Sequence, residues 1–431
     1  MVKRTLILSE KETDHMLNLY NTMSRKIEPF KPRSSEAVKM FTCGPSIYRR
    51  PHVGNYRSFL WEDVLLRYLE FQGYRVERVI NFTDVEDKAI AEAEQEGRSV
   101  QEITDSIANQ FFKEAELLHI KLPDFIPRSS TSVDQAVHII KALLAKGYAY
   151  WHANDVFYDP LKFSDFGKLF RLDMTRWPKQ RKRFRRDTYP GRRWNLGDFI
   201  LWHGYKDGDS LYWDTDIGRG RPAWNVQDPA MITKHLGYEI DIACGGVDNL
   251  YRHHDYNIAV IEGVSGQEFA HYWIHGEHLL VDGKKMSKSR GNIVYPDDLM
   301  KDGYDPTHVR FYLIYGHHRE ELNLTREHLK ETSRKLDLFR TMVNEVAAQS
   351  NSSVSRGEET EKILQRLEQG FETGMNDDLN VRSAFDSLFK SMSEILELKK
   401  KDLLTTEESQ RVGRTVARID RVLQVDLVQN T

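Results

Sequence analysis

The stretch from Met40 to Arg57, MFTCGPSIYRRPHVGNYR, constrains the fold most, because a strand-like pattern leads through it into a helical one. Residues 38–43 alternate in the period-two manner of a strand, and Gly44-Pro45 ends that pattern. Apolar residues then recur every three to four positions from 59 to 69, and a second strand pattern begins at 76. The order predicts a β-loop-α-β unit of a parallel α/β sheet.

The loop brings a histidine and a glycine, His52 and Gly54, to the start of the predicted helix. The first amides of a helix are unpaired and lie at the positive end of its dipole, so they favour phosphate. Gly54 has no Cβ and would let a planar ring or a ribose approach the backbone. The loop therefore favours a nucleotide site, and a glycine-punctuated turn that binds nothing stays open as the alternative.

The chain is long for a single core, and its charge is uneven. It has 431 residues, so two to four domains are expected. Its net charge is −3, so we do not expect it to bind nucleic acid through a generally basic surface. Residues 176–193 hold nine basic residues against one acid, Asp187. This basic strip suits contact with a phosphate backbone, or it is a solvated loop.

Two features indicate the cytoplasm. No apolar run is long enough to cross a bilayer, and the N-terminus does not match a secretory signal. The chain has two cysteines, Cys43 and Cys244, which cannot build a disulfide framework.

Changes of pattern along the chain predict five segments. Residues 1–36 carry a weak helical segment and a Pro- and Ser-bearing approach to the first strand. Residues 37–120 form the first half of a Rossmann-type sheet, and 221–320 form the second half, with a helix from Pro229 and a strand at 238–242. Residues 121–220 are an aromatic-rich insertion between the halves. Residues 321–431 show four apolar helical faces and predict an all-α bundle.

Polar residues follow the predicted strands at the sheet edge where such folds bind ligands. Asn81 to Lys88 follows the second strand, where Thr83 and Asp84 could face a ligand, cap the helix that runs from Lys88, or do both. Ala243 to Asp248 follows the strand at 238–242, and a carboxylate there suits the hydroxyls of a ribose.

A loop rich in cations follows a tight turn at Asp282-Gly283. Lys284 to Asn292, KKMSKSRGN, holds four cations and two serines, which suits a phosphate clamp. A run of lysines is usually solvated surface, but the order KMSKS is specific.

The His-x-Gly-Asn loop and the KMSKS loop together resemble the two nucleotide motifs of class I aminoacyl-tRNA synthetases. Further segments are similar to cysteinyl-tRNA synthetases, in family order and from about Leu17 to Val425. These segments are FTCGPSIYRRPHVGNYRSF, NFTDVEDK, GYAYW, DFILW, DIACGGVDNLYRHH, YWIHGEHLLVDGKKMSKSRGN and GMNDDLN.

The resemblance implies activation of an amino acid by ATP, with Mg²⁺, to an aminoacyl-adenylate. It implies catalytic roles for His52, Lys285 and Lys288, which would stabilise charge developing on the phosphates. The ATP-binding residues that it implies are Gly44, His52, Gly54, Asn55, Asp248, Lys285, Met286, Ser287, Lys288 and Ser289.

The chain departs from this family at the zinc ion with which cysteinyl-tRNA synthetases bind the thiolate of their substrate. The family uses two cysteines, a histidine and a glutamate, and the matching positions here are Cys43, Asp228, His253 and Asn257. Ala243 stands where the family has a histidine ahead of its glycine run, and Cys244 stands where the family has the glycine that follows that histidine. Asparagine is a poor zinc ligand.

Cys43, Asp228 and His253 could still form a three-ligand zinc site, with Cys244 as a replacement, but we expect the site to lack zinc. The amino-acid pocket would then carry ordinary hydrogen-bonding groups and one apolar wall, and would suit a small polar or cationic side chain. Its residues are Cys43, Thr83, Trp224, Asp228, His253 and Asn257.

The second departure is at the C-terminus, where the resemblance predicts that the anticodon-reading module is absent. The mycothiol-pathway cysteine ligase is similar in this respect and transfers cysteine to an amino sugar, but it keeps the zinc ligands. The first hypothesis is thus a ligase that transfers a small amino acid to a small molecule, a carrier or tRNA. A divergent cysteine–tRNA ligase and a non-catalytic paralogue that binds ligands or partners are the alternatives, and the oligomeric state stays open.

Overall fold

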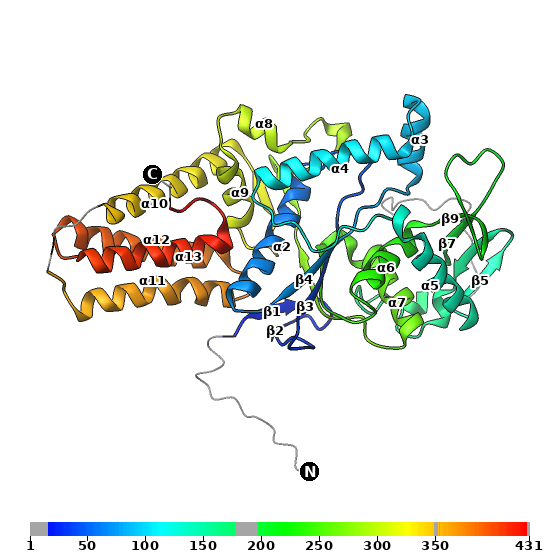
Figure 1. The fold of residues 1–431 in the computed structure, drawn as a ribbon, viewed down its shortest axis with the longest axis horizontal. Coiled ribbons are helices and arrows are strands. Elements are labelled where there is room, and N and C mark those ends of the chain that lie inside the picture. The colour runs from blue at the N-terminus through cyan, green and yellow to red at the C-terminus, as the bar shows by residue number, and fades with distance from the viewer. Residues whose placement is uncertain (1–15, 177–196, 349–351, 353, 429–431) are drawn as a thin grey trace, which may run out of the picture.

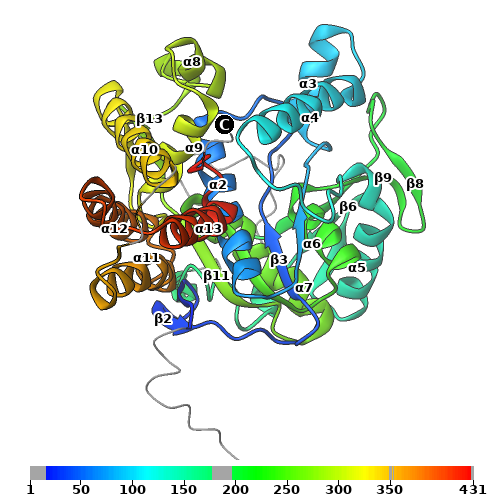
Figure 2. The same cartoon turned by 60° about the vertical axis from the view of Figure 1, so that its left-hand side comes forward.

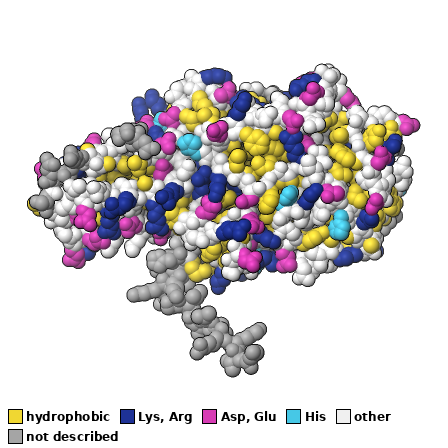
Figure 3. All heavy atoms as spheres, in the orientation of Figure 1, with side chains coloured by type: hydrophobic (Ala, Val, Ile, Leu, Met, Phe, Trp, Pro, Cys, Tyr) yellow, Lys and Arg dark blue, Asp and Glu magenta, His cyan; other side chains and the backbone are white. Residues whose placement is uncertain are grey.

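The structure is a computed structural model that describes residues 16–176, 197–348, 352 and 354–428. Most of the basic strip predicted at 176–193 lies outside these residues. No described helix is both long and apolar enough to cross a membrane. On the face drawn in Figure 3, basic and acidic side chains are interspersed over the described surface.

A parallel sheet of four strands lies at the centre of the molecule (Figure 1), as the sequence predicted. Its order is β11-β10-β3-β4. The strands are β3 (Val38–Thr42), β4 (Val76–Ile80), β10 (Ile240–Gly246) and β11 (Ala270–Gly276). The chain leaves β3 toward β4 on one side and returns through β10 on the other, which makes the β3–β10 pair the switch point where ligands bind in such sheets.

Between β4 and β10 the chain forms α3 (Asp87–Glu96), α4 (Val100–Leu117), α5 (Val133–Ala145) and a five-stranded antiparallel sheet. That sheet has the order β5-β6-β7-β9-β8 and lies at the right of Figure 1. Its strands are β5 (Ala149–His152), β6 (Asp155–Tyr158), β7 (Phe199–Gly204), β8 (Trp213–Thr215) and β9 (Gly218–Pro222). The aromatic strand patterns of the sequence become this sheet, which buries Val156, Leu201 and Trp202 with residues of α5.

Four long helices form a bundle at the opposite end of the molecule, as Figures 1 and 2 both show. They are α10 (Arg326–Ala347), α11 (Glu358–Asn376), α12 (Val381–Lys400) and α13 (Thr406–Leu423). The bundle shares one apolar core with α2 (Val53–Phe71) and α9 (Pro306–Tyr315). A buried ion pair joins Arg310 of α9 to Asp63 of α2 at 2.6 Å. The predicted bundle is confirmed, and it packs against α2, the helix that follows β3.

The structure differs in detail from three local predictions. The described part of the N-terminal segment holds a hairpin of β1 (Asn18–Asn21) and β2 (Lys26–Pro29), and residues 1–15, on which the predicted weak helical segment also falls, lie outside the described residues. The helix predicted from Pro229 is confirmed as part of α6 (Trp224–His235), but α6 begins more than a turn earlier and contains the proline. Asp84 does not cap α3, because its carboxylate accepts from the backbone N–H and hydroxyl of Ser130.

The strand predicted at 238–242 is also longer than expected. β10 continues to Gly246, so Ala243 and Cys244 lie inside the strand and not in a loop after it. Asp248 follows in a short helical turn, Val247–Asn249, and the chain then enters a π-helical stretch, Leu250–Asp255, and α7 (Tyr256–Ser265). Asp228 of α6 lines the same cavity as Gly245 and Gly246 at the end of β10.

Candidate functional site

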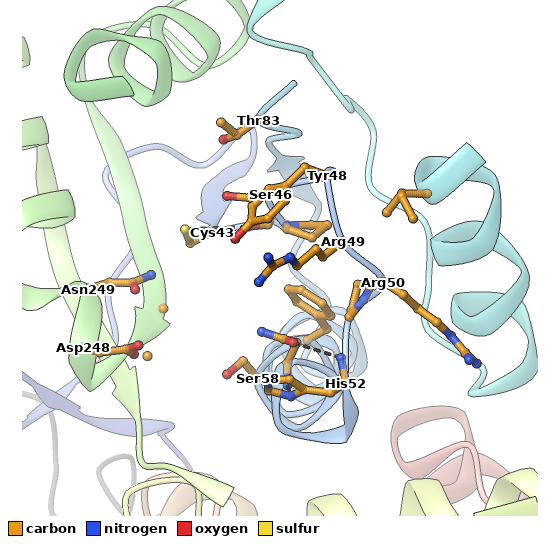
Figure 4. Close-up of a pocket in the computed structure, with 18 of the residues that line it drawn as sticks. Cys43, Ser46, Tyr48, Arg49, Arg50, His52, Ser58, Thr83, Asp248 and Asn249 are labelled. Atoms are coloured by element: carbon orange, nitrogen blue, oxygen red, sulfur yellow. Dashed lines mark hydrogen bonds between the residues drawn. The ribbon is translucent and has the colours of Figure 1, made fainter. Parts of the chain in front are cut away.

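A cavity of about 590 Å³ opens at the carboxyl ends of β3 and β10 (Figure 4). Its walls come from the loop after β3, the first turns of α2, the end of β10 and the KMSKS loop. In Figure 4, Asp248 and Asn249 approach from the β10 side and face Cys43, Ser46 and Arg49 across the opening. The cavity therefore lies at the sheet position that the β-loop-α-β pattern predicted.

Gly44 allows the ends of β3 and β4 to lie close together beneath this cavity. Its N–H donates to Asn81 Oδ1 at 2.8 Å. A Cβ on Gly44 would lie 1.9 Å from the Asn81 carbonyl oxygen, so no side chain fits here. The glycine thereby brings Cys43 and Ser46 to the rim of the sheet, where both line the cavity.

His52 is the N-cap of α2, and its ring closes the helix start. Its Nδ1 accepts from the N–H groups of Gly54 at 3.1 Å and Asn55 at 3.3 Å. The expectation of unpaired amides at this turn is therefore wrong for these two residues, because the histidine side chain already satisfies them. Burial lowers the pKa of His52, so the ring is neutral. With Nδ1 accepting, the proton sits on Nε2, which can donate.

The KMSKS loop follows a hairpin of β12 (Leu279–Val281) and β13 (Lys284–Lys285). Asp282 and Gly283 form its turn with positive φ at both residues, as the sequence predicted. Met286, Ser287 and Lys288 line the cavity. A Cβ on Gly54 would lie 2.7 Å from Met286 Cε, so the space expected for a nucleotide ring above Gly54 is taken by Met286.

Two predicted ATP-binding residues of this loop lie outside the lining. Lys285 Nζ is 3.3 Å from His278 Nε2 and is exposed, and Ser289 Oγ lies 3.2 Å from Ser287 Oγ. Neither is among the described residues that form the cavity wall, whereas His52, Asn55 and Asp248 are. The loop thus presents Lys288, rather than Lys285, to the cavity.

A smaller cavity of about 70 Å³ continues from the large one. The two share Ser46, Thr83, Asp228 and His253. The smaller cavity is closed by Trp224, whose ring centroid lies 5.1 Å from that of His253. Cys43, Thr83, Trp224, Asp228 and His253, all predicted for the amino-acid pocket, therefore surround one connected space. Asn257 is buried beside it on α7, with no described partner for its side-chain N–H₂, and lines neither cavity.

The residues at the family's zinc positions do not fit a zinc ion. The ligand atoms of Cys43, Asp228 and His253 are not among the described groups of three or more that lie within 4.8 Å of one another. Asp228 Oδ1 accepts from Asn81 Nδ2 at 2.7 Å, and its Oδ2 is 3.7 Å from His253 Nδ1. Asn257 stands where the family has a glutamate, and an amide is a poor zinc ligand.

Cys244 cannot replace the missing ligand. It pairs with Thr42 in the β3–β10 ladder, and paired residues of parallel strands point to the same face of the sheet. Cys43 is the next residue along β3 and lies on the opposite side. The Cys244 side chain is fully buried in the core that includes α2 and the bundle, away from Asp228.

Sequence reasoning missed several lining residues, and Glu62 is the most unusual. It lies on α2 with 0% exposure, borders the large cavity, and neither carboxylate oxygen has a described hydrogen-bond partner. Burial raises its pKa well above the ordinary value. A glutamate on an otherwise apolar helical face was the signal that could have identified it. Arg49 and Glu86 also line the cavities and had no distinguishing pattern.

Comparison with known sequences gives consistent matches. Residues 29–334 match the sequence model of the tRNA synthetases class I (C) catalytic domain. A cysteine–tRNA ligase of Chlamydia muridarum is 36% identical over 421 residues, which cover 95% of this chain and 88% of that protein. A cysteine–tRNA ligase of Oceanobacillus iheyensis is 33% identical, and the match covers 96% of this chain and 88% of that protein.

Solved structures are similar in fold. Methionyl-tRNA synthetase of Mycobacterium tuberculosis, bound by methionyl-adenylate, superposes with a TM-score of 0.65 at 14% identity and covers 90% of both chains. A leucyl-tRNA synthetase of Agrobacterium radiobacter, in a complex with tRNA, superposes with a TM-score of 0.65 at 11% identity. The match covers 92% of this chain and 85% of that one.

Proposed function

This chain belongs to the family of class I aminoacyl-tRNA synthetases that carries the (C) catalytic domain, and we propose that it activates a small amino acid with ATP and transfers it to an acceptor. The observation that carries the proposal is the convergence of both nucleotide motifs on one cavity. His52 and Asn55 come from the start of α2, and Ser287 and Lys288 come from a loop far along the chain. A chain that had lost activation would have no need to keep these two motifs together.

In the first step a carboxylate oxygen of the amino acid attacks the α-phosphorus of ATP, which enters as its magnesium complex. An O–P bond forms, the bond to the β-phosphate breaks, and pyrophosphate leaves. Lys288 and the Nε2–H of His52 are donors for the negative charge that develops on the phosphates. Asp248 accepts from ribose hydroxyls, and the protein otherwise acts by holding the two substrates together.

In the second step an amine or hydroxyl of the acceptor attacks the carbonyl carbon of the adenylate, and AMP leaves. The acceptor is a small molecule, a carrier or tRNA. Because the zinc positions do not fit zinc, recognition of the amino acid falls to Asp228, His253 and Trp224. The family's handling of ATP is kept, and its means of choosing the amino acid is replaced.

A second candidate is a divergent cysteine–tRNA ligase of the cytoplasm. The observation in its favour is that the cysteine–tRNA ligases of Chlamydia muridarum and Oceanobacillus iheyensis match 95% and 96% of this chain. The two candidates differ in the amino acid, in zinc content and in the acceptor.

Amino-acid-dependent exchange between ATP and pyrophosphate tests the first step. We expect exchange with at least one amino acid of a panel that includes cysteine, serine and short diamino acids. Exchange with none of them, in protein that binds ATP, would overturn the proposal. Charging of total tRNA with cysteine, together with one zinc per chain, would favour the second candidate.

A further inference from the structure

The smaller cavity is where an amino-acid side chain would lie, if the adenylate is formed in the larger one. It adjoins the large cavity through Ser46, Thr83 and Asp228, and it measures about 70 Å³. A water molecule needs roughly 10–15 Å³ on this measure, so the space admits a side chain of only a few heavy atoms. Long side chains such as those of lysine or arginine do not fit.

Asp228 is the charged group at the junction of the two cavities. It lies on α6, is 6% exposed and lines both of them. One carboxylate oxygen is held by Asn81, and the other lies 3.7 Å from the nearest ring nitrogen of His253, beyond a normal hydrogen bond. The second oxygen is therefore placed to accept from a ligand.

Among the described residues, no lysine or arginine forms an ion pair with Asp228, whose basic neighbour is His253 at 3.7 Å. Asp248 borders the large cavity, and Glu86 and Asp87 border the small one. The cations of the small cavity already have carboxylate partners, since Arg221 pairs with Asp87 at 2.5 Å and Lys88 lies 3.5 Å from Glu86. Arg49, Arg50 and Lys288 line the large cavity, where the phosphates of ATP would lie. The charge of Asp228 is thus not compensated by a described lysine or arginine partner.

The remaining wall is aromatic. Trp224 stacks on Tyr256 with ring centroids 6.0 Å apart and borders the small cavity together with His253 and His203. A carboxylate beside an indole face is a combination that binds ammonium groups, through a charge-assisted hydrogen bond and a cation–π contact. It offers nothing to a thiolate, which the carboxylates would repel.

We propose that the amino acid activated by this protein carries a second ammonium group on one or two methylenes, as in 2,3-diaminopropionate or 2,4-diaminobutyrate, and that Asp228 is the partner of that ammonium. The inference rests on the proposed function and names its substrate class. Asp248 adds negative potential, and Trp224 covers the methylene and the cation.

The experiment is ATP–pyrophosphate exchange with 2,3-diaminopropionate and 2,4-diaminobutyrate against 2-aminobutyrate, cysteine, serine and aspartate. We expect the better diamino acid to exceed 2-aminobutyrate in kcat/KM by at least about tenfold, the effect of one charge-assisted hydrogen bond. In Asp228→Asn this ratio falls toward one. In Asp134→Asn, which removes a carboxylate that pairs with Lys234 of α6 outside both cavities, the ratio is unchanged.

A preference for cysteine, serine or aspartate in the wild type would overturn the inference, and so would an unchanged ratio in Asp228→Asn. If no amino acid supports exchange, the proposed function fails, and calorimetry then decides the inference separately. Binding of 2,3-diaminopropionate to the wild type and Asp134→Asn, with loss in Asp228→Asn, supports it. No binding to the wild type overturns it.

Discussion

The two ends of the connected cavity hold different kinds of residue. At the end that we propose for the nucleotide, the His52 turn and the KMSKS loop match family motifs, and residues of both line one cavity. At the amino-acid end, the positions of a metal site carry Asp228 and Asn257, and the space is lined by carboxylates and aromatic rings. The comparison suggests that activation chemistry and choice of substrate are separable in this fold, because they rely on different strands and loops.

The nucleotide end is tested most strongly at Lys288. Lys288→Ala removes a cation of the cavity wall that we propose to bind the phosphates, and we expect exchange to fall by about 100- to 1,000-fold with every amino acid. Lys284→Ala is the matched control, because Lys284 is an exposed cation of the same loop outside the lining. Equal losses in the two variants would mean that Lys288 acts only through the general charge of the loop.

The amino-acid end is tested by rebuilding the family's metal ligands. Asp228→Cys combined with Asn257→Glu restores a thiolate and a carboxylate, and we expect the double variant to hold about one zinc per chain while the wild type holds far less. Asp228→Cys alone serves as the control, since Asn257 remains a poor ligand. Metal content of the purified proteins gives the answer, and a full complement of zinc in the wild type would contradict the comparison.

Gly44 belongs to the scaffold that both ends share. Gly44→Ala forces a Cβ to within 1.9 Å of the Asn81 carbonyl oxygen, and we expect a loss of about 3 kcal/mol in the free energy of unfolding. Gly413→Ala is the control, because nothing lies within 4 Å of a Cβ at that helical position, and it should stabilise by about 0.5–1 kcal/mol. Denaturant unfolding measures both. Wild-type stability in Gly44→Ala would show that the strands can move apart.

The smallest expected effect lies beneath the cavity, at His275 of β11. Burial lowers the pKa of His275 to about 3, whereas the unfolded chain keeps an ordinary value. The unfolded state therefore binds more protons as the pH falls below about 6.5, and stability drops by about 2 kcal/mol from pH 7 to pH 5.

His275→Gln should make the stability less dependent on pH over this range. His271→Gln, on the same strand with 47% of its side chain exposed, should leave the dependence as it is. Denaturant unfolding at both pH values distinguishes them. An unaltered pH dependence in His275→Gln would mean that the native ring can take up a proton.

The sequence predicted the sheet, the bundle and the place of the site because these depend on local periodicity and on specific motifs. It wrongly predicted unpaired amides at the start of α2, because the motif does not reveal that the ring of His52 accepts from the amides of its own helix. It misjudged Cys244, because the end of β10 determines which face of the sheet that residue occupies. Glu62 could not be placed at a cavity until α2 was packed against β3 and β10.

We propose that this protein keeps the activation of an amino acid by ATP while the amino acid itself has changed. Exchange rates for cysteine and for the short diamino acids, measured on one preparation with its zinc content, test it most directly. We expect exchange that depends on an amino acid, with a diamino acid preferred over cysteine and zinc far below one per chain. Cysteine as the best substrate, with one zinc per chain, would contradict the account.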